Sequence, residues 1–175
     1  MSAENTPRIP GLAAGPSPSP HTPEELATLL RLVTNAGAET VAIGHARDDA
    51  SRAAAAAFAE AWEASGHAVA AVVDWPEEAA SWLRPARRLT EPRPDAWVIA
   101  GGPHGWAQMA RRLRHSTDWD PLRGFGFAAA SDPSVVRLSG AAVLGMRGAR
   151  ADGSVWQTGC GRITHRLSPA RLSAG

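Results

Sequence analysis

Four short apolar runs alternate with helix-like segments through the middle of the chain. Each run is rich in Val, Ile or Ala, and each is followed by a cluster of Gly, His, Asp, Ser or Pro. Strands that alternate with helices are typical of a parallel sheet. We therefore predict an α/β domain with a mostly parallel, doubly wound sheet of four to five strands and helices on both faces, a Rossmann-like three-layer sandwich. The predicted strands are residues 40–44, 67–73, 96–101 and 124–130.

The polar residues, Gly and Pro between these runs predict where the helices begin and end. Thr22, Pro23 and Glu25 form a helix start, with a Thr N-cap, Pro in the first turn and Glu three residues after the cap. Asp48, Asp49 or Ser51 caps a second helix that runs to about residue 65. A short helix is predicted to open at residues 76–78 and to be broken by Pro85. A further helix is predicted after Pro103, and a short one over residues 132–140. The predicted inner face of the helix after Pro103 consists of Trp106, Met109, Ala110 and Leu113.

The two ends of the chain differ in composition from its middle. Residues 1–21 are rich in Pro and Ser, which predicts a disordered tail. Residues 22–150 form the predicted α/β domain. Residues 151–175 form a C-terminal extension whose place the pattern leaves open, and residues 142–146 and 161–164 are either added strands or loops.

Composition limits the function classes. The 44% apolar content is enough for a core, while a net charge of +1 predicts neither a nucleic-acid partner nor an anionic membrane surface. No apolar stretch is long enough to insert into a membrane, and no secretory signal pattern opens the sequence, so we expect a cytoplasmic location. The single cysteine, Cys160, excludes an internal disulfide and a multi-cysteine zinc site. No cofactor and no metal are predicted.

Polar residues follow the predicted strands at the edge where ligands bind in parallel sheets. We predict a small polar or carboxylate ligand there. Backbone N–H groups at Gly101, Gly102 and His104, where a helix begins, are the predicted donors. The remaining predicted ligand-binding residues are His45, Asp48 and Ser131, with Trp75 as a wall, although Asp48 also suits a purely structural helix cap. Trp119 and Trp156 lie in loop-like segments, which is typical of a contact surface.

The order of these pieces resembles one lobe of the type I periplasmic-binding fold, as in the branched-chain amino-acid substrate-binding proteins of ABC transporters. The matching pieces are residues 40–44 with the Asp48-Asp49 turn, 67–73, 94–101, and 127–133 with Ser139-Gly140 downstream, roughly 110 of 175 residues. The resemblance implies a ligand-binding or sensing domain. That family closes two lobes around a ligand, and this chain has the length of one truncated lobe. A homodimer or a partner chain is therefore expected to supply the second.

Two other functions stay open from the residues alone. One is a small enzyme or accessory protein of a secondary-metabolite pathway that uses His45 and His104 as acid and base. The other is a non-catalytic scaffold or interaction protein. No Gly-x-Ser-x-Gly nucleophile motif is present, and the sequence favours a non-catalytic domain without deciding the matter.

Overall fold

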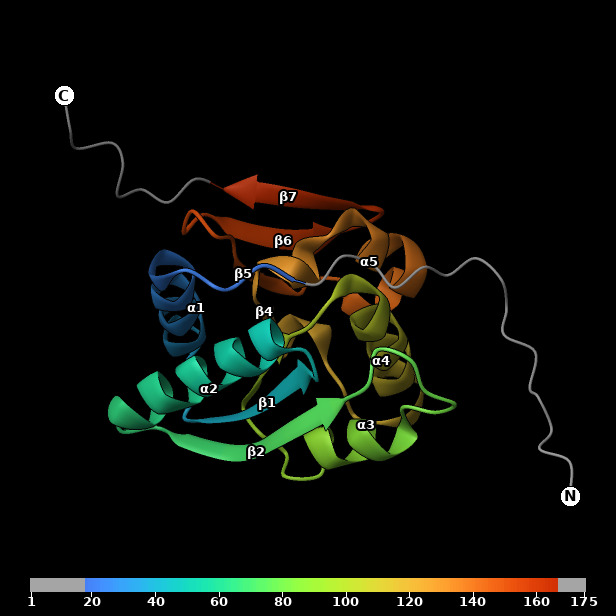
Figure 1. Cartoon of the computed structure of the whole chain (residues 1–175), viewed down its shortest axis with the longest axis horizontal. Helices are drawn as coiled ribbons and strands as arrows, with labels where there is room; N and C mark the ends of the chain where they lie inside the picture. The colour runs from blue at the N-terminus through green and yellow to red at the C-terminus, as the bar shows by residue number, and fades with distance from the viewer. Residues whose placement is uncertain (1–17, 167–175) are drawn as a thin grey trace, which may run out of the picture.

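A seven-stranded sheet organises the chain, in the order β2-β1-β3-β4-β5-β6-β7 (Figure 1). The computed structural model describes residues 18–166. Neighbours from β2 to β5 pair in parallel, and β6 and β7 form an antiparallel hairpin at one end. The α/β prediction is confirmed, with more strands than expected. The strands are β1 Thr40–Ala46, β2 Ala68–Trp75, β3 Ala96–Ala100, β4 Gly124–Gly126, β5 Arg147–Ala149, β6 Val155–Gly159 and β7 Arg162–Arg166.

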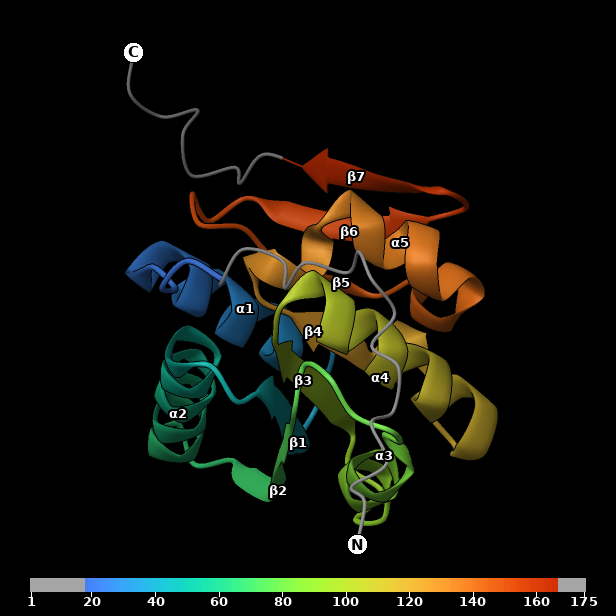
Figure 2. The same ribbon diagram turned by 45° about the vertical axis from the view of Figure 1, so that its right-hand side comes forward.

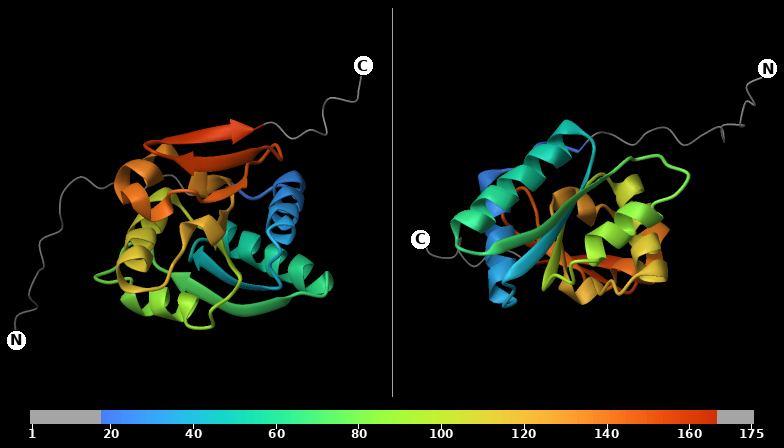
Figure 3. Two further views of the ribbon diagram at one scale, coloured as in Figure 1. Left: turned by 180° about the vertical axis from the view of Figure 1, so that it is seen from behind. Right: turned by 90° about the horizontal axis from the view of Figure 1, so that it is seen from below.

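Helices cover both faces of this sheet (Figures 1 and 3). α1 (Pro23–Asn35) and α2 (Asp49–Ala64) pack on one face, where they close an apolar core with β1 and β3. α3 (Leu83–Thr90), α4 (Pro103–Ser116) and α5 (Pro133–Ser139) close a second core on the other face. The predicted three layers are therefore present, because successive side chains of a buried strand point to opposite faces and each face needs its own cover.

The starts of α1 and α2 follow from local chemistry. Thr22 caps α1: its hydroxyl accepts the N–H of Glu25 at 3.1 Å, and the Glu25 carboxylate accepts the N–H of Thr22 at 3.4 Å. Asp48 caps α2, where its carboxylate accepts the N–H of Ser51 at 2.8 Å. Both predicted starts are confirmed, since each needs only residues three apart in the chain.

The predicted helix at residues 76–78 is wrong. Residues 76–82 form a loop, and α3 begins at Leu83. Pro85 does not break this helix, because it is its third residue. The first N–H groups of a helix have no intrahelical acceptor, so a Pro in the first turn removes no hydrogen bond.

The last third of the chain also differs from the prediction. β4 ends at Gly126, and η2 (Ala128–Ser131), a short 3₁₀ helix, replaces the second half of the predicted strand. Residues 151–166 belong to the same sheet through β6 and β7. Most of the predicted N-terminal tail, residues 1–17, lies outside the described residues, whereas residues 18–21 lead into α1.

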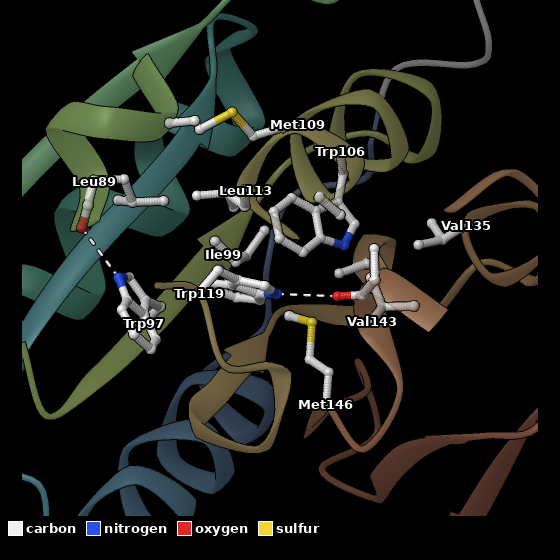
Figure 4. Packing of buried hydrophobic residues seen from close by; sticks show 14 of the residues in the cluster. Leu89, Trp97, Ile99, Trp106, Met109, Leu113, Trp119, Val135, Val143 and Met146 are labelled. Carbon is white, nitrogen blue, oxygen red and sulfur yellow. Dashed lines mark hydrogen bonds between the residues drawn. The ribbon is translucent and has the colours of Figure 1, made fainter. Parts of the chain in front are cut away.

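Tryptophans dominate the core under α3, α4 and α5 (Figure 4). The indole N–H of Trp97 donates to the carbonyl of Leu89, and that of Trp119 donates to the carbonyl of Ala142, both at 3.0 Å. Trp119 and Trp156 are 2% and 0% exposed, so the predicted contact surface at these two residues is wrong. Their indoles fill the space between the sheet and the helices. The residues that flank them in the sequence do not indicate this burial.

Candidate functional site

A cavity of about 750 Å³ lies at the carboxyl ends of the central strands. Its wall includes the start of α2, the turn from β3 into α4, and the η2 segment that leads into α5. The approach to α1 and the β5–β7 end of the sheet complete the wall. The lining residues fall in the ranges 18–21, 50–54, 100–104, 127–134 and 150–151, together with Glu25, Ile163 and His165.

Three of the seven predicted ligand-binding residues line this cavity. Gly101 and His104 do so from the β3–α4 turn, and Ser131 does so from the end of η2. The Ser131 hydroxyl donates to the carbonyl of Ala128 at 2.7 Å, which orients its oxygen. The parallel strand order thus brings the turns after β3 and β4 together, as the sequence predicts.

His45 does not line the cavity. It is a residue of β1, and its Nδ1 lies 2.7 Å from the carbonyl oxygen of Ala46. His104 is therefore the one member of the predicted acid/base pair that the structure places in the cavity wall. The geometry does not assemble the two imidazoles that the enzyme hypothesis needs.

Trp75 is not a cavity wall. It is fully buried in the core under α3 and α4. A Cβ at Gly44 would lie 2.6 Å from the Trp75 ring, and one at Gly101 would lie 3.0 Å from it. The two glycines therefore leave room for an indole that packs across the sheet, which is the physical reason the prediction is wrong.

Gly102 faces a carboxylate of the protein itself. The N–H of Gly105, in the first turn of α4, donates to Oε2 of Glu77 at 2.7 Å, and a Cβ at Gly102 would lie 3.2 Å from Oε1 of the same side chain. Burial raises the pKa of the Glu77 carboxyl, and Asp48 adds to the rise, while the N–H groups of Gly105 and Gly102 and nearby His104 offset it in part. The predicted anion site at this helix end is thus partly filled from within the chain.

Ser51 lines the cavity at the start of α2, whereas the predicted ligand-binding residue Asp48, which caps this helix, does not line it. One carboxylate oxygen of Asp48 caps the helix, and the other is buried without a hydrogen-bond partner among residues 18–166. The Ser51 hydroxyl, which belongs to the cavity wall, is also buried without a hydrogen-bond partner among these residues. Buried polar atoms normally have a partner, so these two atoms mark a place where a ligand or water can bind.

Glu25 and His21 are cavity residues that the sequence analysis did not assign to the site. Glu25 is 3% exposed, and its Oε1 accepts the N–H of Ala128 at 2.6 Å, so it ties α1 to η2. Burial raises the pKa of the Glu25 carboxyl, which the N–H groups of Ala128 and Thr22 and the nearby His21 offset in part. Nδ1 of His21 is buried without a partner in the described residues. The capping pattern identified Glu25 as a helix residue, but no local signal connects it to Ala128.

The charged groups of the wall are not balanced. The Asp132 carboxylate is engaged by α5, where it accepts the N–H of Ser134 at 2.8 Å. Arg150 contacts the ring of His165 at 3.0 Å and forms no ion pair within residues 18–166. The acidic oxygens of the wall are largely engaged internally, whereas a guanidinium is available, so the cavity is chemically suited to an anionic group.

Comparison with solved structures gives the same fold. The chain is similar to an extracellular ligand-binding receptor from Rhodopseudomonas palustris (17% identity, TM-score 0.65, 75% of this chain and 36% of that one). It is also similar to a substrate-binding periplasmic protein from Ralstonia solanacearum (16%, 0.66, 77% and 38%) and a leucine-binding protein from Thermotoga maritima (18%, 0.59, 70% and 36%). The resemblance to one lobe of the type I periplasmic-binding fold is confirmed. No protein-family profile and no curated protein sequence matches the chain.

These structures correct one prediction and leave another untested. Two of these neighbours are an extracellular receptor and a periplasmic protein, which contradicts the cytoplasmic location expected from the sequence. Among residues 18–166, no helix is long and apolar enough to span a bilayer. The expected homodimer stays a prediction.

Proposed function

We propose that the chain is a ligand-binding lobe that holds a small, carboxylate-bearing molecule in the cavity at the strand ends. The observation that carries this proposal is the cavity itself: about 750 Å³ at the edge where ligands of parallel α/β sheets bind. Ligand sites of this size are usually concave and mostly apolar, with a few polar groups that fix orientation.

The wall favours a ligand with a carboxylate. The cavity wall contains one arginine, Arg150, which forms no ion pair within residues 18–166. A guanidinium pairs with a carboxylate through two parallel hydrogen bonds. His104, Ser51 and Ser131 supply further polar contacts. Amino acids are the first class to test, because one structural neighbour is a leucine-binding protein. The neighbours also support a location outside the cytoplasm.

A second lobe completes the site in this proposal. The chain spans 36–38% of the length of the three structural neighbours. A single lobe leaves one side of the ligand in solvent. A second copy of the chain or a partner chain would cover that side and shield the carboxylate–guanidinium contact from water, which strengthens it.

A thermal-shift screen of amino acids and small mono- and dicarboxylates tests the proposal, followed by isothermal titration of any stabilising compound. A ligand at a hundred times its Kd stabilises the folded state by about 2.7 kcal/mol. We expect Arg150→Met to weaken binding at least about tenfold, the effect of a lost charge-assisted hydrogen bond. Arg88→Met, which removes the same charge on α3, is the matched control and should bind normally.

Two results would refute the proposal. The first is that no amino acid or carboxylate stabilises the protein at millimolar concentration. The second is that Arg150→Met and Arg88→Met weaken binding equally, which would indicate a general charge effect and not a contact in the cavity.

A further inference from the structure

A second concave region runs along the outer face of α4, apart from the cavity already described. It is a groove of about 680 Å³ that shares no residue with the first cavity. Gln108, Arg111, Arg112 and His115 form its floor, and they recur at the i, i+3, i+4 and i+7 positions of one helix face. Trp82 lies on one side, and residues 141–142 of η3 (Gly140–Val143) lie on the other.

The helices around this groove are strongly basic. α3, α4 and α5 lie on the same side of the sheet (Figure 2) and together carry seven Arg and two His, with no Asp or Glu. On the opposite face, α1 and α2 carry five acidic residues and two Arg. A net charge of +1 for the whole chain therefore hides a large separation of charge between its two faces.

The arginines of the groove have no acidic partner in the described part of the chain. The two ion pairs found there involve Arg47 and Arg52, which lie outside these helices. Like charges three and four residues apart on a helix repel one another. The negative end of the α4 dipole explains basic residues in its last turn, Arg114 and His115, but not Arg111 and Arg112 one turn earlier. An anion in the groove would remove the remaining repulsion.

We propose that this groove binds a small molecule with two or more phosphate groups. Arg111 and Arg112 present two guanidinium forks, the side-chain geometry that best matches phosphate oxygens, and Gln108 adds an amide donor. The volume fits a molecule the size of a nucleoside diphosphate. The partly exposed Trp82, whose indole N–H donates to the carbonyl of Pro76, offers its ring to the organic part of such a molecule.

Two features disfavour a nucleic acid as the occupant. Binding of single strands relies on several exposed aromatic rings that stack on bases, whereas Trp82 is the only one of the seven Trp that is even partly exposed, and Tyr is absent. The positive face is also limited to three short helices. A small polyphosphate uses the concave part of that face, whereas an extended polymer would use all of it.

Isothermal titration of the full chain with inorganic pyrophosphate and with ADP, at about physiological salt, tests the proposal. We expect saturable one-to-one binding. The double variant Arg111→Gln/Arg112→Gln should weaken it about a hundredfold, at about tenfold for each lost guanidinium contact. The double variant Arg87→Gln/Arg88→Gln removes the same charge from α3, outside the groove, and should weaken binding less than about threefold. Circular dichroism checks that both variants are folded.

The proposal is overturned if pyrophosphate and ADP show no saturable binding, or if the two double variants weaken it equally. A DNA duplex of about 20 base pairs and vesicles rich in phosphatidylglycerol test for a larger partner. The proposal is also overturned if either of them binds more tightly than pyrophosphate and ADP, and if the two double variants weaken that binding equally. Because Arg150 belongs to the other cavity, Arg150→Met should leave pyrophosphate binding unchanged, which separates this proposal from the proposed function.

Discussion

Replacing Glu25 tests whether the wall of the first cavity is held by one buried carboxylate. Its Oε1 accepts the N–H of Ala128 in η2, more than a hundred residues away in the chain, and its Oε2 accepts the N–H of Thr22. Glu25→Ala would leave the N–H of Ala128 without an acceptor. It would also remove half of the capping box at the start of α1.

The cost follows from these two losses. Ala128 is half-buried, and an N–H left without a protein acceptor costs about 1–3 kcal/mol, with the lower end expected where water can reach it. A lost helix cap costs about 1 kcal/mol. Glu25→Ala should therefore reduce the free energy of unfolding by about 2–4 kcal/mol, a large part of the roughly 5–15 kcal/mol typical of a domain. Glu25→Gln keeps an oxygen that can accept the N–H of Ala128, so its cost should be near 1 kcal/mol.

Urea unfolding followed by tryptophan fluorescence measures these differences, because the buried indoles become exposed to solvent on unfolding. Glu24→Ala is the matched control: Glu24 is an exposed acid in the same helical turn, and its loss should cost less than about 1 kcal/mol. If Glu25→Ala and Glu24→Ala destabilise the protein equally, the bond from Glu25 to Ala128 does not hold η2 against α1.

The pH dependence gives a second, independent check. Burial raises the pKa of Glu25 in the folded state above its unfolded value, so the folded state holds this proton more tightly. The stability contributed by Glu25 is therefore greatest in acid and falls as the pH rises through the raised pKa. Glu25→Gln removes that loss, so the variant should gain stability relative to the wild type between about pH 4 and pH 7. A variant that loses stability relative to the wild type over this pH range would contradict the raised pKa of Glu25.

Two further substitutions test the packing around the sheet. Gly148→Ala should lower the free energy of unfolding by about 3 kcal/mol or more, because its Cβ would overlap the carbonyl oxygen of Gly126 on the neighbouring strand. Gly159→Ala is the control, since the atom nearest to its Cβ would be 3.8 Å away. Equal melting temperatures for the two variants would refute the clash. Glu77→Gln should gain stability relative to the wild type as the pH rises from about 4 to 7, since burial raises the pKa of Glu77 as well. Urea midpoints at the two pH values measure this, and a constant difference would show that burial does not raise this pKa.

The parts of the fold that the sequence predicts well depend on contacts within one turn or one strand. The capping box at Thr22, the Asp48 cap and the inner face of α4 all involve residues three or four apart. Strand direction follows from the alternation of strands and helices. The prediction fails at Pro85 because the first turn of a helix tolerates Pro, and nothing in the local pattern shows that this turn starts at Leu83.

Only part of the candidate site could be predicted, because its residues come from many separate segments of the chain. Gly101, His104 and Ser131 could be predicted, since each lies in the segment that follows a strand: Gly101 directly after β3, His104 in the first turn of α4, and Ser131 at the end of η2, after β4. Trp75 also follows this rule, yet its indole lies in the core, because Gly44 and Gly101 leave space for it on that side. Which of two residues at a strand end faces a cavity depends on distant neighbours, and no spacing in the sequence encodes that.

The position of Glu77 changes how a carboxylate ligand is expected to bind. A helix N-terminus attracts one anion most strongly, and the first turn of α4 already has the Glu77 carboxylate on the N–H of Gly105. A second carboxylate at the same backbone groups would meet like-charge repulsion. A ligand anion in the cavity should therefore be bound by a side-chain cation, and Arg150 is the one arginine that lines the cavity. This shifts the expected specificity determinant from the glycine-rich turn, where the sequence placed it, to the end of β5.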